Sequence, residues 1–306
     1  MSELRHRVDD YLAMRRALGY GLRSHGRLLP DFADYLDEAG ATAITIEHAL
    51  AWATRPRGVQ PYHWRHRLSV VRGFARYLHS LDATTEVPPS DLLAYRRQRP
   101  TPYLFSDSEI AALLDAAGAL APTLRAATYR MLFGLLAVTG MRVNEALHLE
   151  RDDVDLDRGV LTIREAKFKK SRRLPLHEST VAALRAYARE RDRLCNQPRD
   201  CRFFVSVRGT APAYETVRGV FAALRGRAGL RARAGTTRPR IHDLRHSFAV
   251  STLLGWYRDG EDVAARMPLL SAYLGHVGPA STYWYLQAAP GLLAAAAQRL
   301  EPGAQP

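Results

Sequence analysis

A stretch rich in proline and arginine, residues 83–102, divides the sequence into two parts and most constrains what the chain can fold into. Its prolines and arginines are Pro88, Pro89, Arg96, Arg97, Arg99, Pro100 and Pro102. Proline fixes one backbone angle and donates no main-chain hydrogen bond, so this composition suits a semi-extended linker rather than a packed element. The sequence therefore predicts a first domain over residues 1–85, a linker over 86–102 and a second domain over 103–306.

The first domain shows apolar residues at helical spacing, and no strand pattern interrupts them. Helices are expected before the turn at Gly19, around residues 28–36, over 46–52 and over 62–81. The last of these carries arginines beside an apolar face. Arg65, Arg72 and Arg76 are therefore candidates for contact with phosphates, and a solvated charged face is the alternative.

The second domain is predicted to be mainly α with one small antiparallel β-sheet. Ser106 and Glu109 have the spacing of a capping box, so a helix opens the domain, and a second helix over 122–138 stops at Gly140. A short helix over 142–149 follows. Three β segments are expected at 154–156, 160–164 and 172–176, and helical patterns then recur near 179–193, 214–228, 242–256, 262–274 and 279–287. Residues 290–300 predict one more short apolar helix.

The charge balance points to an acidic partner. Lys plus Arg number 44 against 31 Asp plus Glu, which gives a formal charge of +13. Codon bias can explain arginine in place of lysine but not this excess, and arginine is suited to two-pronged contact with phosphate. We therefore expect DNA or RNA as the partner. The longest apolar run, residues 131–138, is far shorter than the ~20 residues of a membrane span, and no export signal is evident, so a cytoplasmic, nucleoid-associated location is expected.

All three lysines lie within four residues, at the turn between the second and third β segments. They are Lys167, Lys169 and Lys170, and the other 41 cationic residues (44 minus 3) are arginines. Arginine effectively never loses its proton, whereas the pKa of lysine moves readily, so proton donation to a leaving group requires lysine. The alternative is a basic turn that contacts DNA, for which Lys169, Lys170 and Arg172 are candidates.

Two further pairs could bind an anion. Arg142 and Glu145 are three residues apart at a helix start after Gly140, so the carboxylate could hold the guanidinium in place, although a plain surface pair is the alternative. His242 and Arg245 share one face at the start of another helix, where the helix dipole favours a phosphate.

A metal centre is not expected. His246, four residues after His242, could complete a metal pair, but no further ligand is evident because Asp243 lies elsewhere on the helix. Cys195 and Cys201 are too few for a disulfide framework or a zinc site. We therefore expect incidental thiols, and neither metal nor cofactor.

The last motif places two tyrosines shortly after a glycine and a histidine. Gly275 ends one helix, and the next begins at Gly278 and Pro279, with Tyr283 and Tyr285 in its following turn. Two residues span about 200 degrees of a helix, so the two rings should face opposite sides. Packed core aromatics are the alternative interpretation.

Together these features resemble the tyrosine recombinase and integrase family. The matching strings are Thr139-Gly140-Met141-Arg142, His242-Asp243-Leu244-Arg245-His246 and Leu274-Gly275-His276, followed by Tyr285 nine residues later. The resemblance covers essentially the full chain. It implies a helical core-binding domain that binds DNA and an α+β catalytic domain. One departure is the setting of the loop lysine, Ala166-Lys167-Phe168 instead of Gly-Lys-Gly, which leaves Lys169 as an alternative.

The resemblance also implies roles for the residues. Arg142 and Arg245 would clamp the scissile phosphate, His242 and His276 would hydrogen-bond it or move protons, and Glu145 would orient Arg142. Lys167 would be the general acid and Tyr285 the nucleophile, with Tyr283 as its rival. The tyrosine would displace a 5′-hydroxyl and leave a 3′-phosphotyrosine, with no metal and no ATP.

The function implied is site-specific recombination of double-stranded DNA by a tetramer, for integration, excision or transposition of a mobile element, with a lean toward a transposon. A type IB topoisomerase-like enzyme has similar catalytic residues and is the alternative enzyme. A catalytically inactive DNA-binding protein on the same scaffold would be expected to lack an Arg, the Lys or the Tyr, and all of these are present.

Overall fold

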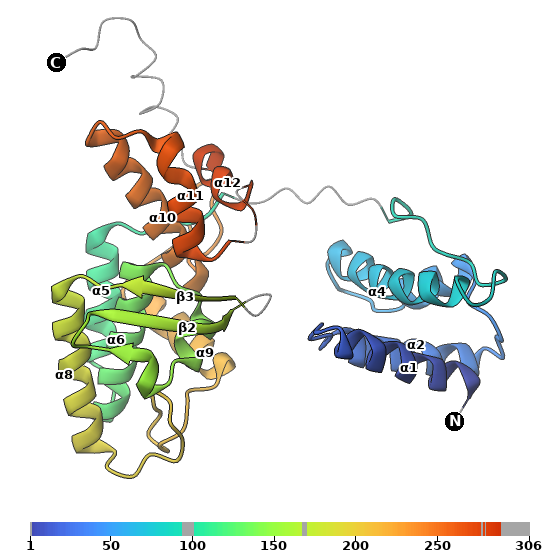
Figure 1. Ribbon diagram of the computed structural model, residues 1–306, viewed down its shortest axis with the longest axis horizontal. Coiled ribbons are helices and arrows are strands. Elements are labelled where there is room, and N and C mark those ends of the chain that lie inside the picture. Colours follow the sequence, from blue (N-terminus) through green and yellow to red (C-terminus); the bar gives the residue numbers. More distant parts are fainter. Residues whose placement is uncertain (1, 94–100, 167–169, 277, 279, 289–306) are drawn as a thin grey trace, which may run out of the picture. The chain divides into compact units, whose positions relative to one another are not determined.

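The chain forms two compact units, one ending at residue 99 and the other beginning at residue 100 (Figure 1). The computed structural model describes residues 2–93, 101–166, 170–276, 278 and 280–288. Each unit has its own hydrophobic core. Among the described helices, none combines the length and the apolarity that a membrane span requires.

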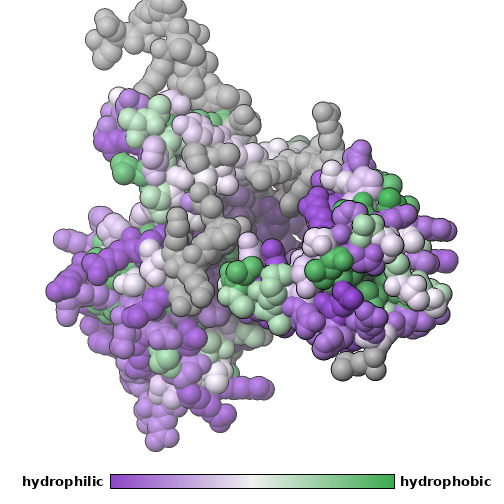
Figure 2. Space-filling view, turned by 45° about the vertical axis from the view of Figure 1, so that its right-hand side comes forward, coloured by the Kyte–Doolittle hydropathy of each residue, from purple (hydrophilic) through white to green (hydrophobic). Residues whose placement is uncertain are grey.

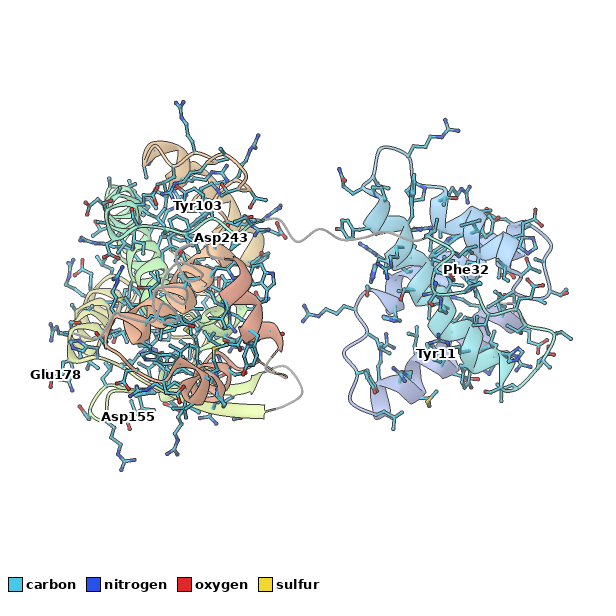
Figure 3. All side chains as sticks on the ribbon, turned by 90° about the horizontal axis from the view of Figure 1, so that it is seen from above. Tyr11, Phe32, Tyr103, Asp155, Glu178 and Asp243 are labelled. Carbon is cyan, nitrogen blue, oxygen red and sulfur yellow. The ribbon has the colours of Figure 1, made fainter. Side chains whose placement is uncertain are left out.

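Over residues 2–93 the first unit is a bundle of four helices: α1 (Glu3–Ala17), α2 (His25–Glu38), α3 (Ile46–Thr54) and α4 (Pro61–His79). The helical periodicity of residues 1–85 is thereby confirmed. Phe32, Trp52 and Phe74 are fully buried at its centre. Tyr11 and Phe32 lie among the helices rather than on the surface (Figure 3).

The beginning of the proline-rich segment is packed, which differs from the prediction of a semi-extended linker from residue 86. The buried guanidinium of Arg72 donates from Nε to the carbonyl of Pro88 (2.7 Å) and from Nη2 to that of Pro89 (2.6 Å). The backbone N–H of Glu86 also donates to the carbonyl of Ile44 (2.9 Å). Proline lacks an N–H but keeps its carbonyl, so a buried arginine can bind this stretch to the first unit.

The second unit combines helices with a three-stranded sheet. Its helices are α5 (Asp107–Gly118), α6 (Thr123–Thr139), α7 (Val143–His148), the 3-10 helix η1 (Arg151–Asp153), α8 (Glu178–Leu194), α9 (Tyr214–Arg227), α10 (Ile241–Arg258), α11 (Val263–Leu274) and α12 (Ala280–Ala288). The strands are β1 (Val154–Asp155), β2 (Val160–Ala166) and β3 (Lys170–Pro175). The fold class predicted from the sequence is confirmed. The helix expected over 290–300 lies outside the described residues.

The sheet is antiparallel in the order β1-β2-β3, with Leu161 opposite Leu174 and Ile163 opposite Arg172. Leu161, Ile163 and Leu174 are buried in the core of the unit. Helix α6 is central, because it contacts α5, α8 and α10. Hydrophilic side chains cover most of the visible surface of the second unit (Figure 2).

Two helix ends place the backbone of the candidate site. Gly140 ends α6 in the left-handed conformation (φ +59°), and a Cβ there would lie 2.5 Å from the ring of Phe248. Gly275 ends α11 in the same way (φ +69°), and a Cβ there would lie 2.7 Å from Nη1 of Arg172. Glycine alone has neither a Cβ nor a penalty at positive φ, so both turns require it.

Candidate active site

Arg245 lies at the centre of a cluster of predicted site residues. It is buried on α10, and its Nη1 and Nη2 donate to the carbonyls of Gly140 (2.8 Å) and Leu274 (2.7 Å). The ends of α6 and α11 therefore hold its side chain. Burial lowers the pKa of Arg245 to about 10, and the charge of Arg142 acts in the same direction. The guanidinium thus remains charged near pH 7.

Arg142 lies beside it and is hydrogen-bonded to Glu145. Nη1 of Arg142 donates to Oε1 of Glu145 (2.8 Å), and its backbone N–H donates to Oε2 (2.8 Å). Nη2 donates to the carbonyl of Gly275 (2.8 Å). Arg142 and Arg245 thus bind the carbonyls of two consecutive residues at the end of α11. Part of the Arg142 side chain, 30%, remains exposed to solvent.

Arg172, a predicted DNA contact, is instead engaged inside the protein. Its Nη1 and Nη2 donate to Oε1 (3.1 Å) and Oε2 (2.8 Å) of Glu145, and its Nε donates to the carbonyl of Tyr273 (2.9 Å). Its side chain is 12% exposed. Burial acts to raise the pKa of Glu145, but the hydrogen bonds from Arg172 and Arg142 outweigh it and keep that pKa below its usual value. The carboxylate is therefore ionised and shared by two arginines.

Three histidines surround Arg245. Desolvation, with the charge of Arg245 adding to it, lowers the pKa of His276 to about 4 and also that of His242 to about 4, although His242 lies exposed at the rim. Desolvation followed by the neighbouring His242 lowers the pKa of His246 to about 3. All three rings are therefore neutral near pH 7, when each retains one N–H donor.

The two candidate tyrosines face opposite sides of α12, as helical geometry predicts. Tyr285 is 2% exposed, whereas Tyr283 is 46% exposed. The Tyr285 ring stacks on His276 with centroids 6.1 Å apart, and its hydroxyl lies 3.3 Å from Nδ1 of His246. Burial raises the pKa of the Tyr285 hydroxyl, while adjacent Arg245 acts to lower it.

The structure adds two residues to those picked out as site residues from the sequence. His246 contacts Tyr285 directly, although the sequence suggested for it no more than a metal pair. Buried Thr282 lies with its Oγ1 2.7 Å from Nδ1 of His276. A signal for both existed: His246 is four residues after His242, and Thr282 is three before Tyr285, so each shares a helical face with a predicted site residue.

The remaining candidates are not part of this cluster as described. Lys167 and Lys169 lie outside the described residues, and of Lys170 only the backbone, at the start of β3, is described. In the first unit Arg65 and Arg76 are exposed, whereas Arg72 is buried. Asp243 at the start of α10 is fully buried and bonded to Arg240, so it serves as a helix cap (Figure 3).

The cluster is built to bind an anion and bring it to a phenol. Two arginines are held rigidly by carbonyls and a shared carboxylate, and neutral histidines add N–H donors without adding charge. Fixed donors of this kind stabilise negative charge that develops on the oxygens of a reacting phosphate. The buried side chain of Tyr285 lies next to these groups, and a phenol hydroxyl is a group that can attack phosphorus.

Comparison with known proteins agrees with this geometry. The model of the phage integrase family matches residues 104–291. The protein y4rB of Sinorhizobium fredii, named as an integrase/recombinase, is 45% identical over 98% of each chain. The tyrosine recombinase XerD of Caulobacter vibrioides is 31% identical over 96% of each chain.

Solved structures share the fold. The Tn1549 transposon integrase in complex with transposon right end DNA has a TM-score of 0.69 at 14% identity, covering 97% of this chain and 99% of that one. The XerH site-specific recombinase bound to its palindromic difH substrate has a TM-score of 0.67 at 20% identity, covering 91% and 79%. The family model, the relatives and the cluster around Arg245 together show that this chain belongs to the phage integrase family of tyrosine recombinases, which are DNA strand-transfer enzymes.

Proposed function

We propose that this chain is a site-specific recombinase that cleaves DNA through Tyr285, for integration, excision or transposition of a mobile element. One observation carries the proposal. Arg142 donates to the carbonyl of Gly275 and Arg245 to that of Leu274, so the two guanidiniums meet at adjacent residues next to the buried Tyr285. Two fixed guanidiniums beside one phenol form a site for a phosphodiester and its nucleophile.

In the proposed reaction, a scissile phosphate binds between the guanidiniums of Arg142 and Arg245. Its non-bridging oxygens gain negative charge as the oxygen of Tyr285 attacks, and the arginines together with His242 and His276 stabilise that charge. The bond from phosphorus to the 5′-oxygen breaks, and Lys167 donates a proton to that oxygen. The product is a 3′-phosphotyrosine and a free 5′-hydroxyl, which preserves the bond energy for rejoining.

The partner proposed is double-stranded DNA, bound by a tetramer of this chain in the bacterial cytoplasm. The first unit is proposed as a core-binding domain that contacts phosphates through the exposed Arg65 and Arg76. Lys169 and Lys170 would add contacts near the cleavage point. DNA-bound relatives of this fold, including the Tn1549 integrase and XerH, support DNA as the partner.

The decisive experiment traps the covalent intermediate. The protein is incubated with a nicked duplex that carries the ends of the genetic element encoding it, and adducts that resist denaturant are quantified. The wild type should form an adduct, Tyr285→Phe should form none, and Tyr283→Phe should behave as the wild type because that ring is exposed. An adduct that persists in Tyr285→Phe would reassign the nucleophile, and relaxation of supercoils without a target sequence would favour a topoisomerase.

A further inference from the structure

His246 has a contact that the proposed roles of the other residues leave unexplained. It lies on α10, one turn after His242, and its Nδ1 is 3.3 Å from the hydroxyl oxygen of Tyr285. Its ring contacts those of Trp284 and His242, with centroids 5.3 and 4.6 Å away. These contacts restrict the movement of the ring beside the hydroxyl.

The direction of the hydrogen bond follows from the other neighbours of the hydroxyl. The charge of Arg245 acts on the Tyr285 hydroxyl, but a guanidinium can only donate, so Arg245 offers no acceptor for the phenolic hydrogen. Burial raises the pKa of Tyr285, so the oxygen also carries its own hydrogen. That hydrogen needs an acceptor, and the neutral ring of His246 presents Nδ1 to it.

We propose that His246 is a catalytic residue that accepts the phenolic proton of Tyr285 as its oxygen attacks the scissile phosphate. The inference rests on the proposed function and adds the missing proton acceptor to it. In cleavage, the O–H bond of Tyr285 breaks, a bond from hydrogen to Nδ1 of His246 forms, the tyrosine oxygen bonds to phosphorus, and the 5′-oxygen leaves with a proton from Lys167. Rejoining reverses each transfer, so Tyr285 recovers its proton from His246.

The charges around His246 make it a base that depends on bound DNA. Arg240 and Arg245 of the α10 segment are cations, while His242 and His276 lie close by, and together with desolvation they disfavour a proton on His246 in the free protein. A phosphodiester bound beside Arg142 and Arg245 brings a negative charge that opposes these cations. Binding of DNA should therefore raise the pKa of His246 and strengthen it as a base.

The experiment compares two substitutions that separate a proton acceptor from a hydrogen-bond partner. His246→Asn retains an acceptor atom near the position of Nδ1 but cannot hold a proton, whereas His246→Phe retains the packing against Trp284 and has no acceptor. Ser251→Ala, an exposed position on the same helix, is the control. Adduct formation is measured in single turnovers between pH 6 and 9 on a duplex with a 5′-bridging sulfur, whose departure needs no proton from Lys167.

We expect the wild-type and Ser251→Ala rates to vary little over this range. Both His246 variants should be slower by about 100-fold or more at pH 7, and their rates should rise about tenfold per pH unit because solvent must then remove the proton. DNA affinity, measured with uncleaved duplex, should stay within a factor of two, and circular dichroism should show native helicity.

Two results would overturn the role of His246 and leave the proposed function intact. One is a wild-type rate in His246→Asn, which would make the residue a hydrogen-bond partner that takes no proton. The other is a loss in both variants by the same factor at every pH, which would indicate a structural defect. If the wild type forms no adduct through Tyr285, the proposed function itself fails and the role of His246 falls with it.

Discussion

Arg172 of β3 and Glu145 of α7 form a two-pronged ion pair, with nitrogen–oxygen distances of 3.1 and 2.8 Å. The same carboxylate binds Arg142, and Arg172 also packs against Gly275, whose carbonyl accepts from Arg142. Through Glu145 and Gly275, Arg172 therefore connects β3 to Arg142, the guanidinium proposed to bind phosphate. Arg172 is best described as a positioning residue.

Arg172→Lys should weaken this linkage, because an ammonium cannot reproduce the planar fork of a guanidinium. We expect the free energy of unfolding to fall by about 2 kcal/mol and adduct formation to slow by about tenfold, with DNA affinity nearly unchanged. Urea unfolding and single-turnover cleavage check this. Arg173→Lys, an exposed neighbour on β3, is the control and should change stability by less than about 0.5 kcal/mol. If Arg172→Lys lost DNA affinity by the same factor as cleavage rate, Arg172 would again be assigned as a DNA contact.

Thr282→Val should disturb His276 while preserving side-chain shape. The substitution removes the hydroxyl 2.7 Å from Nδ1 of His276, so the ring loses the partner that fixes its orientation. We expect cleavage to slow by about tenfold, consistent with the ~1–2 kcal/mol that such a hydrogen bond contributes. Exposed Ser281→Ala should cleave as the wild type does. A wild-type rate in Thr282→Val would show that His276 needs no orienting group.

Lys167→Arg tests the proposed general acid, because it keeps the charge and removes the ability to donate a proton. Cleavage of ordinary DNA should fall by about 10² to 10⁴, with little change in affinity. A 5′-bridging sulfur, which leaves without a proton, should restore the rate. The matched variant Lys169→Arg should cleave normally. Failure of the sulfur to rescue Lys167→Arg would move the role to Lys169 or make Lys167 structural.

His246 also predicts how stability depends on pH. Its pKa is about 3 in the folded protein and about 6.5 when unfolded, so the unfolded state binds more protons between these values. Stability contributed by the neutral ring is therefore complete above pH 6.5 and declines as pH falls toward 3. We expect His246 to contribute about 1–2 kcal/mol of the stability lost between pH 7.5 and 5, so urea unfolding should show a shallower decline in His246→Asn than in the wild type. His242 and His276, whose pKa values are also lowered, add to the decline in both proteins. Identical declines in the two proteins would contradict this.

The arginines of α4 should separate into two kinds. Arg76→Ala should reduce the slope of log affinity against log salt by about one, because an exposed contact with one phosphate is lost, without lowering stability. Arg72→Ala should instead destabilise the protein by about 2 kcal/mol, since the carbonyls of Pro88 and Pro89 lose their donor. Filter binding at several salt concentrations and urea unfolding distinguish the two. A reduced slope in Arg72→Ala at unchanged stability would reverse the assignment.

Local sequence was sufficient wherever short-range geometry decides the structure. The Ser106–Glu109 capping box, the left-handed end of α6 at Gly140 and the opposite faces of Tyr283 and Tyr285 all follow from spacings of a few residues. Hydrogen bonds within a helix and its caps span three or four positions, so these patterns are complete in the sequence.

The sequence could not show how arginines would be used. Arg72 and Arg76 are similar members of one basic helix, yet one is buried against prolines and the other is exposed. Arg172 looked like part of a basic turn, but it binds a carboxylate 27 positions earlier. Whether an arginine is buried depends on which carbonyls and carboxylates the folded chain brings near it. The spacing of residues in the sequence does not predict these distant partners.

By itself, the sequence determined the helices, the small sheet and the set of chemical groups that mark a recombinase. The tertiary structure decided how those groups meet: Arg142 binds a carbonyl 133 residues away, and Arg245 one 105 residues away. Only the tertiary structure revealed the contact between His246 and Tyr285, which are 39 positions apart in the sequence. The physical reason is that backbone spacing fixes local hydrogen bonds, whereas contacts between distant side chains exist only after the hydrophobic cores have packed the helices together.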